Sequence, residues 1–100
     1  MSAAEINRSS RVAATTEVAS AELQDEAVLL NLKDGVYYGL NPVGSRVWEL
    51  VQEPRTVGEV CDTIASEYDV EPDRCERDIV SLVQELAASG LVEVENETAP

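Results

Sequence analysis

The chain has 100 residues, of which 44% are apolar and 27% are charged. That length predicts one domain, and the apolar content is high enough for a packed core, which excludes a wholly disordered chain. Twenty acidic residues against seven basic ones give a formal net charge of −13. Such a charge disfavours nucleic-acid binding, which depends on basic contacts to phosphate. The apolar runs are also too short to span a membrane.

Residue types that commonly carry chemistry are scarce. The chain has no His, so the commonest general base and metal ligand is missing. Cys61 and Cys75 form no CxxC motif, which disfavours a zinc site or a disulfide framework; a disulfide between them is geometrically possible but not expected in the cytoplasm. The N-terminus lacks the apolar segment of a secretory signal. We therefore expect a cytoplasmic binding protein with no cofactor and no metal.

The two ends of the chain show no hydrophobic period. Residues 1–12 and 96–100 are predicted to be mobile tails on either side of one domain over residues 13–95.

Residues 18–40 have the pattern of three strands, at about 18–23, 27–32 and 36–40. Lys33-Asp34-Gly35 is a hairpin signal between the last two. A three-residue loop there makes one wholly apolar face, through the pairs Leu32–Val36, Leu30–Tyr38 and Val28–Leu40. The sequence thus predicts an antiparallel meander with Leu29 and Tyr37 facing outward and Tyr38 facing the core.

Three helices are predicted after the strands. The first begins with Asn41 as N-cap and Pro42 at N1 and runs to about Gln52, the second opens with a capping box at Thr56, and the third runs from Pro72 until Gly90 ends it. Trp48 and Tyr68 are expected in the core. A short strand at 91–94 follows. The predicted fold class is α+β: a three-stranded antiparallel meander followed by three helices, winged-helix-like.

The third predicted helix is more apolar than one core stripe requires. The stripe itself consists of Cys75, Ile79, Leu82 and Leu86. Val80, Val83 and Ala87 extend the apolar surface round one side. Two interpretations remain open, either a wide core face or one wall of a groove.

The predicted strand at 36–40 lies at an edge of the meander. It contains no Lys or Pro to protect that edge, and Gly39 allows another backbone to come close. An open edge beside an apolar helix flank suits β-strand addition by a peptide. Alternatively, the strand at 91–94 or a second copy of the protein covers the edge.

Sequence motifs extend over most of the chain from about Val12 to Val94. The hairpin and helix start read VLLNLKDGVYYGLNPVG from Val28, followed by Trp48-Glu-Leu50, Arg55-Thr56-Val57 and LAASGLV from Leu86. With these motifs the chain resembles the PqqD family, whose founding member is the coenzyme PQQ synthesis protein D. The form YYGLN…G…W is most similar to the stand-alone, leader-binding members found with lasso-peptide biosynthesis.

This resemblance implies a non-catalytic chaperone that binds the leader of a ribosomally made precursor peptide. In the family, the leader adds as a strand to the third strand of the meander, in a cleft walled by the third helix. The protein would then present the precursor to a separate, cysteine-protease-like leader peptidase, after which an ATP-dependent cyclase closes the ring. Carried over by position, the peptide-binding residues are Val36, Tyr37, Tyr38, Gly39 and Leu40 on the strand and Glu76, Val80, Val83, Gln84 and Ala87 on the helix.

Two other functions are compatible with such a fold. The first is service to a radical-SAM maturase, as in PQQ synthesis itself. The second is that of a winged-helix DNA-binding regulator, which the net charge of −13 strongly disfavours.

Overall fold

The structure, a computed structural model, describes residues 6–24 and 26–96. The elements in chain order are β1 (Arg11–Ala14), β2 (Val18–Leu23), β3 (Glu26–Asn31), β4 (Tyr37–Leu40), α1 (Pro42–Leu50), β5 (Arg55–Thr56), α2 (Val57–Tyr68), α3 (Pro72–Ala88) and β6 (Val92–Glu95). The strands form two three-stranded antiparallel sheets, of order β2-β3-β4 and β5-β1-β6. This confirms the predicted α+β fold with a meander before three helices, whereas the second sheet was not predicted.

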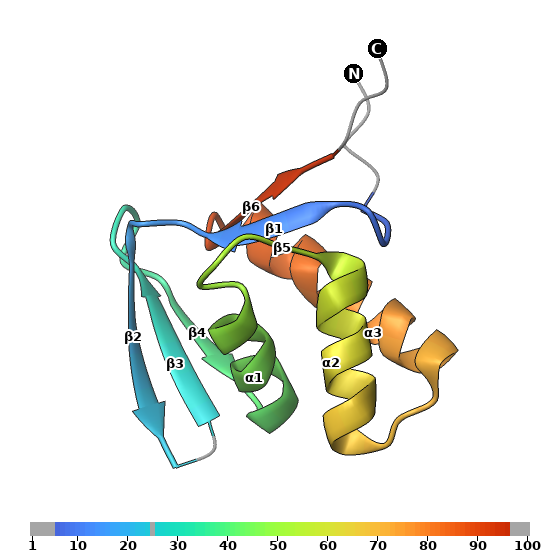
Figure 1. Ribbon diagram of the computed structural model, residues 1–100. Coiled ribbons are helices and arrows are strands. Elements are labelled where there is room, and N and C mark those ends of the chain that lie inside the picture. The colour runs from blue at the N-terminus through green and yellow to red at the C-terminus, as the bar shows by residue number, and fades with distance from the viewer. Residues whose placement is uncertain (1–5, 25, 97–100) are drawn as a thin grey trace.

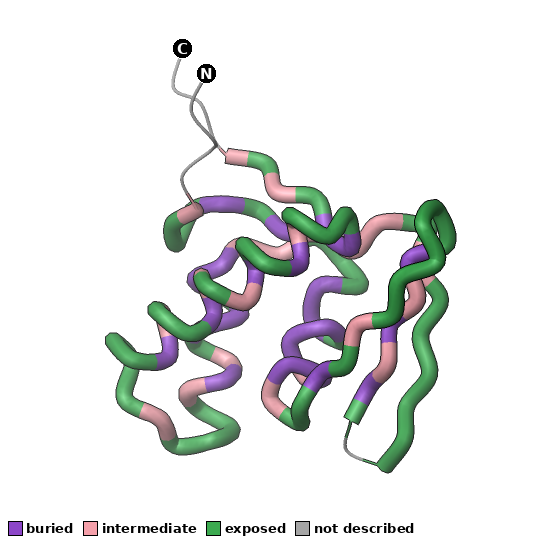
Figure 2. The backbone as a smooth tube through the Cα atoms, turned by 180° about the vertical axis from the view of Figure 1, so that it is seen from behind, coloured by how far each residue is buried: buried purple, intermediate pink, exposed green. Residues whose placement is uncertain are grey.

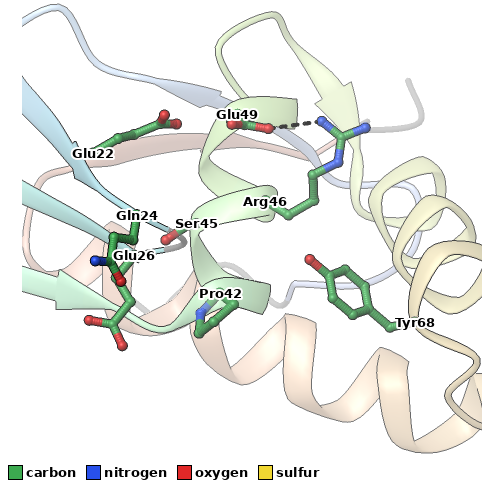
Figure 3. A pocket seen from close by; sticks show the side chains of 8 residues that line it. All are labelled: Glu22, Gln24, Glu26, Pro42, Ser45, Arg46, Glu49 and Tyr68. Carbon is green, nitrogen blue, oxygen red and sulfur yellow. Dashed lines mark hydrogen bonds and ion pairs between the residues drawn. The ribbon is translucent and has the colours of Figure 1, made fainter.

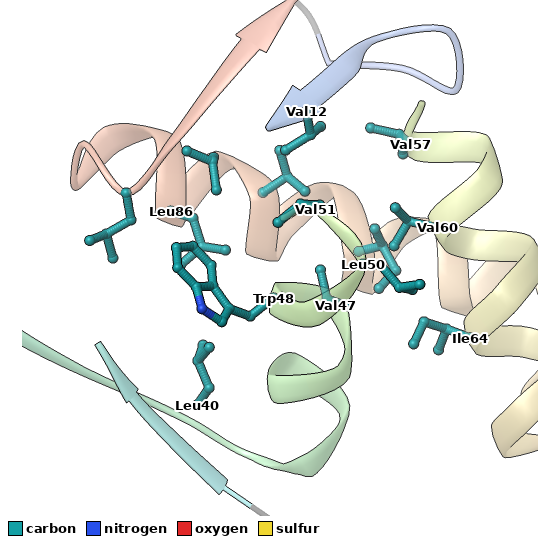
Figure 4. Close-up of a cluster of buried hydrophobic side chains, with 14 of the residues drawn as sticks. Val12, Leu40, Val47, Trp48, Leu50, Val51, Val57, Val60, Ile64 and Leu86 are labelled. Carbon is teal, nitrogen blue, oxygen red and sulfur yellow. The ribbon is translucent and has the colours of Figure 1, made fainter. Parts of the chain in front are cut away.

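The three helices lie between the two sheets and to one side of the meander. In Figure 1 the β2-β3-β4 sheet stands beside α1, α2 and α3 lie on the far side of α1, and the β5-β1-β6 sheet crosses one end of the helices. Trp48 of α1 is buried among side chains of β4, α1 and α3 (Figure 4), as the sequence predicts. Leu40 lies beside its ring. The core therefore joins the meander to the helices through α1.

The register of the β3–β4 hairpin differs by one residue from the predicted one. Leu29 lies opposite Tyr38, and Asn31 opposite Val36, with a four-residue loop between them. Gly35 occupies the left-handed region (φ +74°) in that loop. Because a slip of one residue exchanges the two faces of a strand, Leu29 is fully buried rather than outward-facing. In β4 the predicted faces are correct for Tyr37, which is exposed, and for Tyr38, which is half-buried against the core. The prediction is wrong for Val36, which lies before the strand and is 58% exposed.

Asn31 is the physical reason for that difference. The predicted register, with Val28, Leu30 and Leu32 on the apolar face, leaves the Asn31 amide on the outer face, but Asn31 is buried. Its Nδ2 donates to the Ser89 carbonyl oxygen at 2.7 Å, and its Oδ1 accepts from the Lys33 N–H at 2.9 Å. Since both ends of the amide are satisfied, its burial carries no large desolvation cost. The hydrogen bond to Ser89 also ties β3 to the end of α3.

The second sheet involves residues that the sequence had assigned to a tail. Arg11 and Val12 lie in β1, which pairs with both β5 and β6, and Val12 is buried in the core. The hydroxyl of Ser10 donates to the side-chain oxygen of Asn96. Residues 1–5 and 97–100 of the expected tails lie outside the described residues. A strand that the sequence did not reveal thus joins the two ends of the domain.

The predicted helix boundaries are largely confirmed. The side chain of Asn41 caps α1, and Thr56 and Glu59 form a complete capping box at α2. After α3, the N–H of Gly90 bonds the Ala87 carbonyl and the N–H of Leu91 bonds the Leu86 carbonyl. These two hydrogen bonds, with Gly90 at φ +75°, form a Schellman motif, which ends the helix.

Two smaller predictions have opposite outcomes. Cys61 and Cys75 are free and buried, at the crossing of α2 and α3, as their apolar stripes indicated. Tyr68, at the last turn of α2, is 40% exposed and is not a core residue. Its ring lines a cavity beside α1 (Figure 3) instead of packing into the core, although the helical period places it on the buried stripe. None of the helices among the described residues combines the length and the apolar sequence that crossing a bilayer requires.

Candidate functional site

The outer edge of β4 is unpaired. In the part of the chain that the structure describes, β4 pairs only with β3, while β6 pairs with β1 on the other sheet. The expected alternative, coverage of this edge by the strand after the third helix, is therefore wrong. Seen from behind in Figure 2, β4 lies on the accessible side of the meander.

The backbone groups that face this open edge can be identified from the register. The Asn31 N–H donates to the Val36 carbonyl at 3.0 Å, so this opposed pair is of the hydrogen-bonded kind. Pairs alternate along an antiparallel ladder. The residues of β4 whose backbone groups point away from β3 are therefore Tyr37 and Gly39. A Cβ built on Gly39 meets no atom within 4 Å, so another chain can approach closely here.

One flank of α3 faces β4. The hydroxyl of Tyr38 donates to Glu85 Oε1 at 2.5 Å, and Asn31 reaches the carbonyl of Ser89 one turn later. The hydrogen bond raises the pKa of Tyr38 to about 12, with smaller contributions from burial and from the Glu85 charge. Both contacts lie toward the C-terminal end of α3. From there the backbones of β4 and α3 diverge (Figures 1 and 2).

Two cavities lie along this flank of α3, and we call the space between the flank and β4 the β4–α3 groove. The larger, here called the wide cavity, measures about 320 Å³ and has a mainly apolar lining that includes no residue of β4 but does include Asn41, which follows that strand. The smaller, here called the narrow cavity, measures about 90 Å³. The wide cavity lies between α1, α2 and α3, and its lining includes Val43, Asp78 and Leu82. The narrow cavity lies beside the hairpin loop, and its lining includes Val36 and Tyr38. The Tyr38–Glu85 hydrogen bond connects β4 to α3 across the groove.

The helix residues predicted to wall the groove lie elsewhere on α3. At 100° per residue, Glu76, Val80 and Ala87 fall about 170° from the flank that contains Asp78, Leu82 and Glu85. Glu76 accepts from Arg8, at 3.5 Å, in the segment before β1.

The other two predicted helix residues are also away from the groove surface. Val83 is only 1% exposed and belongs to the core, while Gln84 is exposed on the far side of the helix. The open edge and the predicted helix residues thus do not face each other. The extra apolar surface of α3 is a wide core face, the alternative that the sequence left open.

Sequence reasoning missed the flank that does face β4 because it is mostly polar. Leu82 was assigned to the core, yet it is half-buried and lines the wide cavity. Asp78 and Glu85 looked like a solvated face. The sequence gives only a weak signal for this flank, namely a Leu between two carboxylates at helical spacing.

A larger cavity lies on the opposite side of α1. It measures about 510 Å³ and is lined by residues of the β2–β3 hairpin, α1 and Tyr68 (Figure 3). Its charged groups are engaged with one another. Arg46 pairs with Glu49 at 3.0 Å and with Glu67 at 2.8 Å, and Glu49 raises the pKa of Glu22 through a side-chain hydrogen bond. This cavity lies beside β2, the other edge strand of the meander, and its lining is mainly polar.

The groups that remain for covalent or metal chemistry are poorly suited to it. Burial raises the pKa of Cys61 to about 11 and also raises the pKa of Cys75, so both thiols stay protonated at neutral pH. Among the described residues, no group of three or more Cys, Asp or Glu side chains is placed to hold a metal ion. The arrangement at β4 instead defines a binding domain with an open strand edge and an apolar cavity beside it.

Comparison with known proteins identifies the family of this domain. The profile described as coenzyme PQQ synthesis protein D (PqqD) matches residues 26–92, and the chain belongs to the PqqD family. A search of curated proteins finds no significant match.

Two solved structures share the fold. One, described as TbiB1 in complex with the TbiA(beta) leader peptide, is 38% identical over 87% of this chain and 99% of that chain, with a TM-score of 0.75. The other, described as lasso peptide synthetase B1 complexed with the leader peptide, is 28% identical over 82% of this chain and 96% of that chain, with a TM-score of 0.72.

Proposed function

We propose that this protein binds the leader of a ribosomally made precursor peptide, that of a lasso peptide, by adding the leader as a strand to β4. The observation that carries this proposal is the unpaired edge of β4 with its outward-facing groups at Tyr37 and Gly39. Main-chain hydrogen bonds at such an edge supply affinity, and pockets for alternate side chains supply specificity. Both structural neighbours are described as complexes with a leader peptide, which supports the same role here.

The proposed contacts keep the strand half of the sequence prediction. Within the predicted segment Val36–Leu40, Tyr37 and Gly39 would bond the leader through their outward-facing backbone groups, while Leu40 is buried. On α3 the proposal moves from Glu76, Val80, Val83, Gln84 and Ala87 to the flank of Asp78, Leu82 and Glu85. The wide cavity, with Val43 and Leu82 in its lining, would hold an apolar side chain of the leader.

The proposal includes a presenting role without catalysis, in the cytoplasm, where ribosomes make the precursor. It is supported by the lack of His in the sequence and by the raised pKa values of the two thiols. The chemistry would belong to partners, namely a separate leader peptidase and the cyclase that acts after it.

A surface for such a partner remains free when a strand adds to β4. The outer face of the meander is apolar, and it exposes Leu23 and Tyr37 at 63% and 69%. Cross-strand neighbours on the same face are Ala19, Ala21, Val28 and Leu30. Large exposed apolar patches mark protein contacts, so this face supports the presence of a protein partner.

The direct test is a titration of the full-length protein with the leader peptide encoded beside its gene, followed by amide NMR. The proposal expects the largest shifts at Tyr37 and Gly39 and at residues that line the wide cavity. Binding with shifts confined to β6 would contradict the site, and absence of binding at micromolar concentrations would contradict the function. In the latter case a peptide client of a radical-SAM maturase becomes the next probe.

A matched pair of variants separates the two flanks of α3. Leu82 and Val80 are both half-buried apolar residues packed against the core, but only Leu82 lines the wide cavity. Leu82→Gln should weaken leader binding about tenfold, because it places an amide where the cavity would receive an apolar side chain. Val80→Gln should bind as the wild type does. The reverse order of affinities would show that the leader contacts the flank of Val80, which the sequence predicted.

A further inference from the structure

Three carboxylates lie along the β4–α3 groove. Asp78 lies in the lining of the wide cavity, Asp34 in that of the narrow cavity, and Glu85 accepts the hydrogen bond that connects β4 to α3. No Lys or Arg lines either cavity among the described residues. A strand that enters the groove therefore meets negative charge from α3.

Asp78 and Glu85 have only weak or neutral partners. Arg74 reaches Asp78 at 3.9 Å, with both side chains 71% exposed, so water screens that pair and it contributes little. Glu85 is held by a neutral phenol, Tyr38. Both carboxylates can thus accept a stronger, cationic partner without the loss of a strong ion pair. A docked strand would also displace water from them, and a carboxylate that loses water without gaining a partner is destabilised.

The spacing of these groups suits an extended peptide. Four residues along a helix rise about 6 Å, which separates Asp78 from Leu82. Alternate side chains of a strand point the same way and are about 6.6 Å apart. The lining of the wide cavity includes both Leu82 and Asp78, so a side chain that fills this cavity lies beside Asp78, and the side chain two residues further on, in the direction of the Tyr38–Glu85 hydrogen bond, lies near Glu85.

Resting on the proposed function, we infer that the groove selects a leader with a basic side chain two residues from the apolar side chain that fills the wide cavity. Lys or Arg there pairs with Glu85, whereas Asp or Glu meets like charge on a protein whose net charge is −13. The partner chemistry is a cationic, extended peptide segment with an apolar anchor.

The experiment uses three synthetic forms of the leader encoded beside the gene. One is native, and the other two replace the basic residue nearest the apolar anchor by Gln or by Glu. Affinities for the full-length protein are measured by fluorescence anisotropy at about 50 and 300 mM salt, a range in which screening of exposed charges becomes strong. We expect the Gln form to bind about threefold to tenfold more weakly at low salt, the Glu form more weakly still, and the differences to shrink at high salt.

Variants of the protein assign the effect to the groove. In Asp78→Asn/Glu85→Gln the three peptides should bind alike; Gln at 85 still offers an oxygen to Tyr38, so the fold is kept. The matched control, Glu93→Gln/Glu95→Gln, removes the same charge from β6 and should discriminate as the wild type does. Equal binding of all three peptides to the wild type, or a leader that binds at β4 without a basic residue at that spacing, overturns the inference and leaves leader binding intact. If no form binds, the proposed function fails and the inference fails with it.

Discussion

β4 and β6 are edge strands of the two different sheets, and their edges differ in chemistry. β6 directs Glu93 and Glu95 to solvent, while the side chains of Val92 and Val94 face the protein. β4 has no charged residue, and one of its four positions is Gly39. Charges on an edge discourage pairing with another chain, and their lack permits it.

That difference separates a structural sheet from a binding sheet. The β5-β1-β6 sheet joins the two ends of the domain, and its strands are held by Val12 in the core and by the Ser10–Asn96 hydrogen bond. The β2-β3-β4 sheet is anchored on its inner face and exposes apolar side chains on its outer face. The unpaired backbone groups of β4 therefore lie next to exposed apolar side chains.

The largest expected effect tests the inner face of the meander. Leu29→Ala should lower the free energy of unfolding by about 2–5 kcal/mol, because Leu29 is fully buried and truncation leaves a cavity. Leu30→Ala, one position along and on the outer face, should cost about 1 kcal/mol or less. Urea unfolding followed by circular dichroism measures both. Equal losses for the two variants would contradict the observed register.

The next largest effect concerns the connection between the meander and α3. Asn31→Ala removes the hydrogen bonds to Ser89 and Lys33, and should lower the free energy of unfolding by about 1–3 kcal/mol because buried partners lose their bonds. The neighbouring Leu32→Ala, at an exposed position, serves as the control and should change stability little. If the Asn31→Ala protein were as stable as the wild type, the hydrogen bonds of Asn31 would not be what stabilises the observed register.

The open edge of β4 can be closed by one substitution. Gly39→Pro deletes a backbone donor that points away from β3, and should weaken leader binding about tenfold or more while the β3–β4 hydrogen bonds remain. Gly39→Ala keeps the N–H and its Cβ meets nothing within 4 Å, so it should bind as the wild type does. Isothermal titration calorimetry compares the two, with the hairpin amides monitored by NMR. Wild-type affinity in a folded Gly39→Pro protein would exclude strand addition at this residue.

The smallest expected effect concerns the pKa of Tyr38, whose hydroxyl bonds Glu85 across the groove. Glu85 raises the pKa of Tyr38 from 10.0 to about 12. Since the folded value is the higher one, the stability from this hydrogen bond is complete below about pH 10 and is lost as the pH rises through about 12. Glu85→Gln should lower the pKa of Tyr38 toward its ordinary value, as read from carbon chemical shifts of labelled tyrosine. A pKa that does not move would mean that the hydrogen bond is absent in solution.

Much of the fold follows from local signals in the sequence. The capping box at Thr56, the Asn41-Pro42 helix start and the Gly90 stop each act over a few residues, and all three were predicted correctly. The family followed from the hairpin motif. The open edge of β4 was predicted too, because an unprotected strand at the end of a meander is visible in composition and order alone.

Contacts between distant residues decided the rest. The buried face of β3 depends on a hydrogen bond from Asn31 to Ser89, 58 residues away, so polarity alone assigned that face wrongly. β1 has only four residues, and it is a strand because β5 and β6 lie on its two sides.

The groove flank of α3 was likewise set by tertiary structure. A helical period shows that a helix has an apolar side, but it does not show which neighbour covers that side. Packing buried the apolar flank in the core and left the opposite flank, from which Glu85 bonds Tyr38 of β4, beside the wide cavity that Asp78 and Leu82 line. The sequence by itself determined the elements and the open edge, while only the packed chain decided what faces that edge, because facing surfaces are a property of contacts between elements.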